Sequence, residues 1–502
     1  MKRGREAAAA AGAAAAESSG TTRIGGTGVV PDLGQAPEHG VARNFATLFT
    51  GEAVARIVAF GATIYIARTL GPSSYGAIAF ALAVVLYLSR IADGGMEFFG
   101  LGIREIAEDD RRIETVAPDL ITARIIIAAI LAAGLFAWAP LLPSPDGAVL
   151  ALYGLTLLTI GTNTRWILLG LERSRYLALA RTVGESVMLI LVLLLVRGQA
   201  DVTRVPLAQF AGDSLAALLL LLWLRRRGYR LRVRLRLAVV LPIFRRAAPL
   251  VASALLGLMI YNADLIFLRF FRGRADVGYY AAAYTLISFL LNLGVAYGHS
   301  LLPAFMRLSE QGERQALFQT AVVQVFAITL PIAAGGALLG PQLMGLVFGS
   351  SYGPSTLPLQ LLMWTIPLSL VREVAIVALV VNQRQNFVLR FTAWAAGVNI
   401  ILNLALIPPF GIAGAVVATL ATEVVRSFAA IAHVRRDGLR IDGAGRFWRP
   451  ALATAVMSGV ILLLQPATLW LSFAAGVFAF IAVLTVLGGL RFRRGRIPVL
   501  SV

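Results

Sequence analysis

The chain has 502 residues, of which 58% are hydrophobic and only 14% are charged, and its mean hydropathy is +0.79. Soluble globular domains carry about 25% charged residues, so this composition excludes them and predicts an all-α, polytopic membrane protein. The absence of cysteine excludes disulfides and thiolate metal sites, and the three histidines are scattered. We therefore expect no metal and no cofactor.

The N-terminal residues 1–44 begin with "MKRGREAAAAAGAAAAESSG", a basic start followed by an alanine run. A secretory signal peptide has the same order of features. This run, however, lacks Leu, Ile and Phe, and polar, glycine-rich sequence follows it. We therefore expect a disordered cytoplasmic tail.

Fourteen membrane helices are predicted, because a span needs about 20 mostly apolar residues. They lie at 45–68, 75–96, 116–138, 148–170, 176–196, 205–224, 247–270, 278–302, 318–339, 357–381, 388–407, 411–434, 449–465 and 467–490. The expected organisation is an N-lobe of six helices (45–224), a basic cytoplasmic linker (225–246), a C-lobe of six helices (247–434), and a C-terminal part (435–502) with two helices and a basic tail.

The distribution of basic residues orients these helices. The net charge of +19 does not lie on one face, as nucleic-acid binding would require, but between the apolar spans. With the N-terminus in the cytoplasm, the cytoplasmic segments hold 32 of the 45 Lys and Arg, the opposite loops hold six, and the proposed spans hold seven. This asymmetry follows the positive-inside rule, so both termini are expected in the cytoplasm.

A faint internal repeat relates the two halves at an offset of 202 residues. The stretch "LGPSSYGAIAFALAVVLYL" (70–88) aligns with "GRADVGYYAAAYTLISFLL" (273–291), and this alignment pairs Gly76 with Gly278. An even number of helices per unit makes the repeat parallel. Two parallel lobes that flank a site near the middle of the bilayer are typical of transporters.

Three stretches resemble a known family. They are "ARTLGPSSYGAIAFA" (67–81) with the following "GLGIREIAED", "DLIFLRFFRGRADVGYYAAAY" (264–284) and "LNLALIPPFGIAGAVVATLATE" (402–423). Their order and spacing resemble the polysaccharide biosynthesis and oligosaccharide flippases of the multidrug/oligosaccharidyl-lipid/polysaccharide (MATE-like) exporter superfamily, over about residues 43–434.

The resemblance implies a multi-pass inner-membrane flippase rather than an enzyme. Such a protein moves a polyprenyl-diphosphate-linked oligosaccharide from the cytoplasmic to the periplasmic leaflet for cell-surface polysaccharide biosynthesis, as in lipopolysaccharide and exopolysaccharide pathways. Its expected partners are the lipid-linked oligosaccharide, membrane lipids, and a polymerase or glycosyltransferases of the same pathway, with no nucleic acid.

Charged residues inside a bilayer are costly and therefore mark function or pairing. The intramembrane bases are Arg56, Arg90, Arg124, Arg165, Arg181, Arg372 and Arg426, and the acids are Glu52, Asp93, Glu185, Asp213, Asp264, Glu373 and Glu423. Four pairs have the spacing for contact within one helix, as structural or gating pairs: Glu52–Arg56, Arg90–Asp93, Arg181–Glu185 and Glu423–Arg426. Arg372 and Glu373 are adjacent, about 100° apart, and are expected not to share a face.

Five of these arginines lie in the expected N-lobe. Arg90, Arg165 and Arg181 fall in its cytoplasmic half, and Arg56 and Arg124 lie nearer the middle. Guanidinium binds phosphate through a planar fork, so we expect them to build an inward-facing cavity for the diphosphate and glycan. The alternative is that some of them only extend from helix ends toward water.

Four charges have no partner on their own helix: Arg124, Arg165, Asp213 and Asp264. They must face other helices or a water-filled cavity. Because the chain carries no P-loop motif for ATP, an ion gradient, the membrane potential or consumption of the glycan must drive transport. Asp213 and Asp264 are the candidate ion-coupling residues, and a buried hydrogen bond or ion pair is the alternative for each.

Other functions remain open at this point. A multidrug/cation antiporter and a peptidoglycan-precursor (lipid II) flippase have the same architecture; arginines disfavour the first, because its substrates are usually cationic. A membrane polymerase or ligase would need catalytic groups in an outer segment, and the long outer connection 340–356 is uncharged. A scaffold would leave the arginines unexplained.

The segment 402–423 is expected to form a helical hairpin. Pro408 and Pro409 are expected to end one helix, and Gly411 to allow a tight reversal. Gly414, Ala418 and Thr422 then recur every four residues, which favours close helix packing.

Overall fold

The computed structural model describes residues 38–97, 100–109, 111–308, 310–464, 468–491 and 499–500. Contacts divide the chain into the units Met1–Phe45 and Ala46–Val502, and the description below concerns the second unit. The regular structure of the described residues is helical except for a two-residue pair of antiparallel strands, β1 (Leu490–Arg491) and β2 (Val499–Leu500). The expected all-α class is confirmed. The expected tail lies outside the described residues up to residue 37.

The helices before the basic linker form a group that we call the N-lobe. They are α2 (Glu38–Asp93), α3 (Leu101–Glu108), α4 (Arg112–Thr115), α5 (Ala117–Trp138), η1 (Ala139–Leu141), α6 (Asp146–Gly154), α7 (Thr156–Thr162), α8 (Arg165–Gly170), α9 (Ser174–Leu195), η2 (Gln199–Thr203) and α10 (Arg204–Arg226). Helix α2 begins at Glu38 rather than at the expected residue 45, since no proline interrupts the sequence between Pro37 and Pro72. Gly71, with φ of 72°, breaks it into two helical parts.

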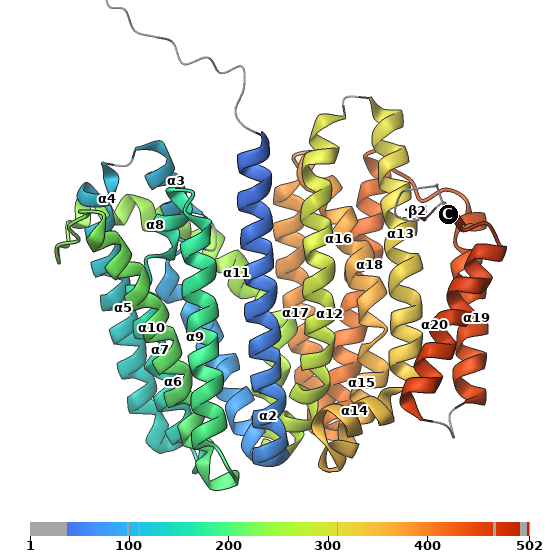
Figure 1. Ribbon diagram of the computed structural model, residues 1–502, viewed down its shortest axis with the longest axis horizontal. Helices are drawn as coiled ribbons and strands as arrows, with labels where there is room; N and C mark the ends of the chain where they lie inside the picture. Colours follow the sequence, from blue (N-terminus) through green and yellow to red (C-terminus); the bar gives the residue numbers. More distant parts are fainter. Residues whose placement is uncertain are drawn as a thin grey trace, which may run out of the picture. The chain divides into compact units, whose positions relative to one another are not determined.

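The helices after the linker form the C-lobe and a C-terminal pair. The C-lobe contains α11 (Leu237–Phe271), α12 (Arg274–Arg307), α13 (Gln311–Leu338), α14 (Gly340–Phe348), η3 (Ser350–Ser355), α15 (Thr356–Leu362), α16 (Thr365–Val381), α17 (Gln385–Phe410) and α18 (Ile412–Arg436). After η4 (Ala444–Arg446), α19 (Trp448–Leu463) and α20 (Leu469–Val486) pack on each other and on α13 (Figure 1).

Ten helices in the described part of the chain are long and apolar enough to cross a membrane. An eleventh span results if the bent pair Ser350–Leu362 and Thr365–Val381 counts as one. The span Val54–Asp93 contains the break at Gly71, which separates the first two expected helices. The chain is a multi-pass membrane protein, and its expected number of fourteen spans stays a prediction.

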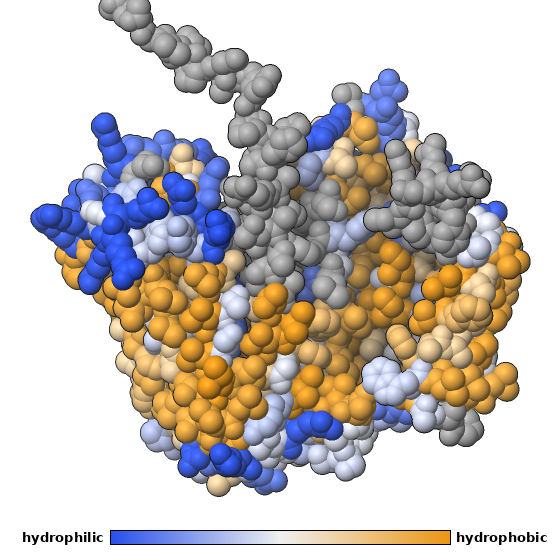
Figure 2. Space-filling view, in the orientation of Figure 1, coloured by the Kyte–Doolittle hydropathy of each residue, from blue (hydrophilic) through white to orange (hydrophobic). Residues whose placement is uncertain are grey.

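The helical bundle has two ends, which we name by their connections. The linker end carries α3, α4 and residues 227–236, and the turn end carries the connections at Gly71, Gly273 and Gly411 (Figure 1). Figure 2 shows a hydrophobic surface along the sides of the helices and a hydrophilic patch over α3 and α4. This pattern fits helices whose sides face lipid and whose ends face water.

The basic linker is shorter than expected, because α11 begins at Leu237 rather than near 247. Residues before Leu237 are held on the N-lobe. The guanidinium groups of Arg234 and Arg236 both donate to the fully buried Asp119 carboxylate at 3.0 Å, and the Arg236 backbone N–H donates to it at 2.7 Å. Two positive partners compensate for the burial of this charge.

Helix α11 packs on both lobes in turn. Ile243, in its first part, belongs to a hydrophobic cluster of the N-lobe around Met96 and Trp166, whereas Ile260 packs with Ala395 and Ala396 of α17. Pro242 directly precedes Ile243, and Pro249 lies between the two contacts. Each proline removes one hydrogen bond from the helix. The part of α11 around the prolines therefore connects the two lobes.

The expected single helix 148–170 consists of three segments, α6, α7 and α8, with breaks after Gly154 and Thr162. Thr156 and Thr159 donate their hydroxyls to carbonyls three residues back, at 2.7 Å each. Such bonds compete with the regular helix ladder. The Asn163 side chain also accepts from the Arg165 N–H at 2.8 Å, which starts α8 anew.

The expected hairpin at 402–423 is confirmed, with one correction. Helix α17 does not end at Pro408 and Pro409 but continues to Phe410. The reversal occurs at Gly411, with φ of 58°, whose N–H donates to Ile407 O at 2.8 Å. The expected small-residue stripe packs closely: a methyl group at Gly414 would overlap the backbone at Leu406.

Candidate functional site: two cavities between and beside the lobes

Two glycines set the geometry of the N-lobe site, where α9 crosses α10. A methyl group at Gly184 would lie 2.8 Å from Gly212 O, and one at Gly212 would lie 2.5 Å from Gly184 O. Such close approach needs small residues on both helices. Because an acid follows each glycine, the crossing brings Glu185 and Asp213 to the same wall of the lobe.

A cavity of about 220 Å³, which we call the arginine cavity, lies at this wall. Four of the predicted site residues line it: Arg165, Arg181, Glu185 and Asp213. Arg181 and Glu185 approach to 4.0 Å, as their spacing predicted, and both side chains are partly exposed. Asp213 accepts a hydrogen bond from Gln209 at 3.1 Å.

Arg165 pairs with an acid that the sequence analysis did not single out. Its Nε lies 3.0 Å from the Glu97 carboxylate, in the turn that follows α2. Burial raises the pKa of the Glu97 carboxyl, and the nearby Arg165 partly opposes this rise. The prediction that Arg165 faces a partner outside its own helix is confirmed.

Arg124 occupies a different environment. It is 1% exposed, and it donates to Asp93 at 3.2 Å, to Ile160 O at 2.7 Å and to Asn163 O at 3.0 Å. The two carbonyls are at the break between α7 and α8, where the helix leaves acceptors unpaired. Arg124 is absent from the described residues that line the arginine cavity.

The other predicted N-lobe charges lie on α2. Arg56 is exposed, and Arg90 is half-buried one turn before Asp93. Asp93 is buried and forms an ion pair with Arg124 of α5 at 3.2 Å, and its expected pair with Arg90 stays a prediction. The side chain of Glu52 lies outside the described residues, so the expected pair with Arg56 stays a prediction.

A second cavity, the interlobe chamber, has a volume of about 310 Å³ and lies between the lobes. Its walls come from α2, α6, α9 and α10 of the N-lobe and from α11 and α12 of the C-lobe. Glu185 lines both this chamber and the arginine cavity. The polar side chains of its lining include Tyr153, Gln209, Asn262 and Ser288.

The lobes are in close contact at the turn end. The fully buried Asp146, at the start of α6, forms an ion pair with Arg269 of α11 and lies 4.0 Å from Arg274 of α12. Arg274 also donates to Ser144 O at 3.0 Å. The Tyr352 hydroxyl adds a bond to Ala67 O at 2.8 Å, so charges and hydrogen bonds both close this end.

A buried charge cluster lies within the C-lobe. Glu423 is fully buried and pairs with Arg372 at 3.2 Å and with Arg426, as its i,i+3 spacing predicted. The Tyr261 hydroxyl donates to Glu423 at 2.7 Å and accepts from Arg372 at 3.0 Å and Arg426 at 2.8 Å. Each charge therefore has an opposite charge and a hydroxyl beside it.

The expectation for Arg372 and Glu373 needs a correction. They were expected not to share a face, yet Arg372 Nη1 lies 3.8 Å from the Glu373 carboxylate. Both side chains are long and flexible, so their ends meet although their Cβ atoms diverge. The main partner of Arg372 is still Glu423.

Asp264 faces other helices of the C-lobe, as predicted. It is 1% exposed, accepts from the Tyr280 hydroxyl of α12, and lies 3.4 Å from the Thr419 hydroxyl of α18. Its other oxygen accepts from the Leu265 N–H at 2.9 Å. Among the described residues that line the two cavities, Asp264 is absent.

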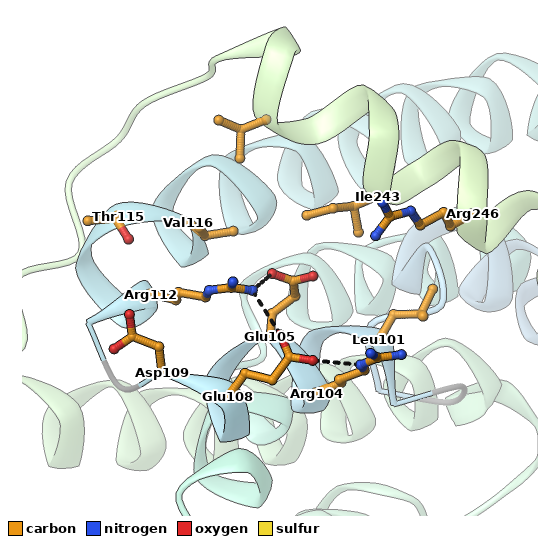
Figure 3. A pocket seen from close by; sticks show the side chains of 11 residues that line it. Leu101, Arg104, Glu105, Glu108, Asp109, Arg112, Thr115, Val116, Ile243 and Arg246 are labelled. Atoms are coloured by element: carbon orange, nitrogen blue, oxygen red, sulfur yellow. Dashed lines mark hydrogen bonds and ion pairs between the residues drawn. The ribbon is translucent and has the colours of Figure 1, made fainter. Parts of the chain in front are cut away.

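A further pocket, of about 570 Å³, lies at the linker end between α3, α4 and the start of α11 (Figure 3). Four of its charges pair with one another: Arg104 contacts Glu108 at 2.7 Å, and Arg112 contacts Glu105 and Glu108. These groups are on the rim and partly exposed, where ion pairs contribute little. Asp109 and Arg246 also line the pocket and lie outside these pairs.

Sequence reasoning missed Glu97, Asp119, Asp146 and Tyr261. Glu97 and Asp146 lie just outside the predicted spans, and Asp119 lies in the first turn of the predicted span 116–138. Tyr261 is one apolar residue among many in a predicted helix. Only the spatial neighbourhood of each residue reveals its partners.

Comparison with known proteins identifies the family. The family described as "Polysaccharide biosynthesis protein" matches residues 41–309, more than half of the chain. A putative O-antigen transporter of Shigella dysenteriae is 23% identical over 76% of this chain and 97% of its own length. The succinoglycan biosynthesis transport protein ExoT of Rhizobium meliloti is 27% identical over 57% of this chain and 58% of its own.

Solved structures show the same fold. A lipid II flippase MurJ in an inward closed conformation superposes with a TM-score of 0.74 at 12% identity, over 88% of this chain and 98% of that one. An inward-facing multidrug resistance MATE family transporter superposes with a TM-score of 0.57 at 16% identity, over 76% and 95%. The expected MATE-like architecture is confirmed. From the sequence match, this chain belongs to the polysaccharide biosynthesis protein family.

Proposed function

We propose that this protein is an inner-membrane flippase that moves a polyprenyl-diphosphate-linked oligosaccharide from the cytoplasmic to the periplasmic leaflet by alternating access. The names of its relatives, an O-antigen transporter and a succinoglycan transport protein, support a polysaccharide cargo. The observation that carries the proposal is the arginine cavity, where Arg165 and Arg181 line one wall of the N-lobe.

The diphosphate binds at Arg165 and Arg181. Their acidic partners are in partly exposed pairs: the Arg181–Glu185 separation is 4.0 Å, and the Arg165 and Glu97 side chains are 25% and 30% exposed. A diphosphate offers more oxygens than a carboxylate, and guanidinium binds it bidentately. The substrate therefore replaces Glu97 and Glu185 as the partner of these arginines. Arg124 stabilises the fold, since its Nη1 and Nη2 groups already donate to Asp93 and to carbonyls at the α7–α8 break.

Transport alternates between two arrangements of the lobes. In the one described, Asp146, Arg269 and Arg274 hold the turn end together. With the linker end in the cytoplasm, as the arginine distribution predicts, this arrangement is closed to the periplasm. Opening toward the periplasm separates these residues, and the proline-containing part of α11 between the lobes absorbs the movement.

The ion-coupling residue is Asp213. It lines the arginine cavity together with Glu185 and Arg181, so a change in its charge acts on the substrate site. Asp264 is the weaker candidate, because three hydrogen bonds inside the C-lobe hold it away from both cavities. Asp213→Asn is expected to retain substrate binding and to lose transport that depends on the proton gradient.

Export of glycan in a strain that lacks its own flippase tests the proposal. Each of Arg165→Ala and Arg181→Ala is expected to lower export about tenfold or more, since a hydrogen bond to a charged group contributes about 1.5–3 kcal/mol. Arg104→Ala, which removes an exposed arginine, serves as the matched control. Unchanged export in the Arg165/Arg181 double variant would overturn the proposal, as would resistance to cationic drugs without glycan export.

A further inference from the structure

The interlobe chamber and the arginine cavity differ in chemistry although Glu185 lines both. The arginine cavity offers two guanidinium groups. Among the described residues that line the chamber, none is Lys or Arg, and Glu185 is the sole charged side chain. The charge that lines the chamber is therefore negative, whereas its partner Arg181 lines the neighbouring cavity.

The other polar groups of the chamber are hydroxyls and amides. Tyr153, Tyr284 and Ser288 bring hydroxyl groups, and Gln209 and Asn262 bring amides. These groups can donate and accept hydrogen bonds without carrying charge. Tyrosine rings add apolar faces on which a sugar ring can pack. Sugar hydroxyls are the complement of such a lining.

The size of the chamber limits what it holds. About 310 Å³ is at the lower end of the usual range of ligand pockets, roughly 300–1,000 Å³. It accommodates the part of a glycan next to the lipid rather than a whole oligosaccharide. A diphosphate at Arg165 and Arg181 places the first sugars beside Glu185, because this residue is common to both cavities.

We propose that the interlobe chamber binds the sugars next to the diphosphate and selects uncharged sugars over acidic ones, with Glu185 as the specificity-determining residue. This inference rests on the proposed function. The Glu185 carboxylate accepts hydrogen bonds from the hydroxyls of a neutral sugar. With Arg181 bound to the diphosphate, a uronic acid would place a second carboxylate beside Glu185, where the described lining of the chamber holds no cation, and like charges in contact disfavour binding.

Binding to the purified full-length protein in detergent tests this. The two probes are farnesyl-diphosphate-glucose and farnesyl-diphosphate-glucuronic acid, which differ only at C6 of the sugar. The glucose probe is expected to bind about tenfold or more tightly. Glu185→Gln, which keeps the shape and removes the charge, is expected to shrink this preference, and Asn262→Lys to reverse it.

The control variant is Asp201→Asn. Asp201 is absent from the described residues that line the two cavities, and its ion-pair partner Arg204 is half-exposed. This variant is expected to keep the preference. Weaker binding of both probes to Arg165→Ala would support the proposed diphosphate site. Equal affinity of the unaltered protein for both probes, or an unchanged preference in Glu185→Gln, would then overturn only the inference on sugar selection. Failure of both probes to bind more tightly than farnesol would instead overturn the proposed function.

Discussion

Gly76 of α2 and Gly278 of α12 form a reciprocal contact between the lobes. A methyl group at Gly76 would overlap Arg274 O, and one at Gly278 would overlap Pro72 O. The two contacts are equivalent, because Gly278 lies 202 residues after Gly76 and Arg274 lies 202 residues after Pro72. The weak repeat in the sequence therefore corresponds to a near-symmetric crossing of equivalent helices.

Replacing either glycine by alanine should force the two helices apart at the turn end. The added methyl group meets backbone rather than a flexible side chain, so relief requires movement of a helix, at a cost of about 1–3 kcal/mol or more. Because the chain has no cysteine, spin labels at Leu141→Cys and Leu357→Cys can report the separation of the lobes. We expect longer label distances in Gly76→Ala and in Gly278→Ala.

Gly61→Ala on the same helix is the matched control, because a methyl group there meets nothing within 4 Å. It should leave the distances unchanged and slightly stabilise α2, by about 0.5–1 kcal/mol. Unaltered distances in both Gly76→Ala and Gly278→Ala would show that the crossing does not keep the lobes together.

Asp146 is expected to lock the turn end through its charge. Asp146→Asn leaves Arg269, 14% exposed, without its counter-charge, and breaking a buried ion pair costs about 3–5 kcal/mol. The same spin labels should therefore report a larger open fraction. The exchange Asp146→Arg with Arg269→Asp should restore part of the closed fraction, and Asp201→Asn, at a half-exposed pair, should change nothing.

If Asp146→Asn stays closed and the charge exchange opens the lobes, shape rather than charge holds this end. That result would contradict the lock.

The charge cluster around Glu423 is expected to stabilise the C-lobe. Glu423→Gln removes the buried acid that Arg372 and Arg426 share and leaves Arg372 only the more distant Glu373, which should lower the free energy of unfolding by about 3–5 kcal/mol. Tyr261→Phe removes only a hydroxyl that bridges the three groups, for a loss of about 1–3 kcal/mol. Thermal unfolding in detergent, followed by tryptophan fluorescence, measures both.

A transport role for the cluster predicts the opposite pattern. Glu423→Gln would then unfold at the temperature of the unaltered protein and yet fail to export glycan. The comparison of stability with export decides between burial and transport for this pair.

The sequence predicted contacts within a helix better than contacts between helices. Glu423–Arg426 and Arg181–Glu185 follow from the period of a helix, and both pairs are found. Partners on other helices, such as Asp93 for Arg124, depend on how the helices pack, and no spacing encodes that. The breaks in α6–α8 were missed because each depends on side-chain bonds that compete with the helix ladder.

The sequence also failed to show where α11 begins. Its first ten residues are rich in Leu and Val, but seven arginines precede them and two more end them, so the linker was expected to extend through them. Their helical form depends on packing of Ile243 and Phe244 against the N-lobe, which a periodicity argument does not reveal.

Variants of Arg124 and Arg165 should distinguish a role in stability from a role in transport. Arg124→Ala removes the opposite charge beside the buried Asp93 and a donor to two carbonyls at the α7–α8 break, so we expect a loss of about 3–5 kcal/mol in unfolding free energy. Arg124→Lys should rescue little, because an ammonium group cannot reproduce the planar fork that reaches both carbonyls. Arg165→Ala, in a partly exposed pair, should unfold normally and lose export. In a double-mutant cycle, Asp93→Asn and Arg124→Gln should be less destabilising together than the sum of the single changes. Additive losses, or a stable but export-deficient Arg124→Ala, would instead place Arg124 among the residues that contact the substrate.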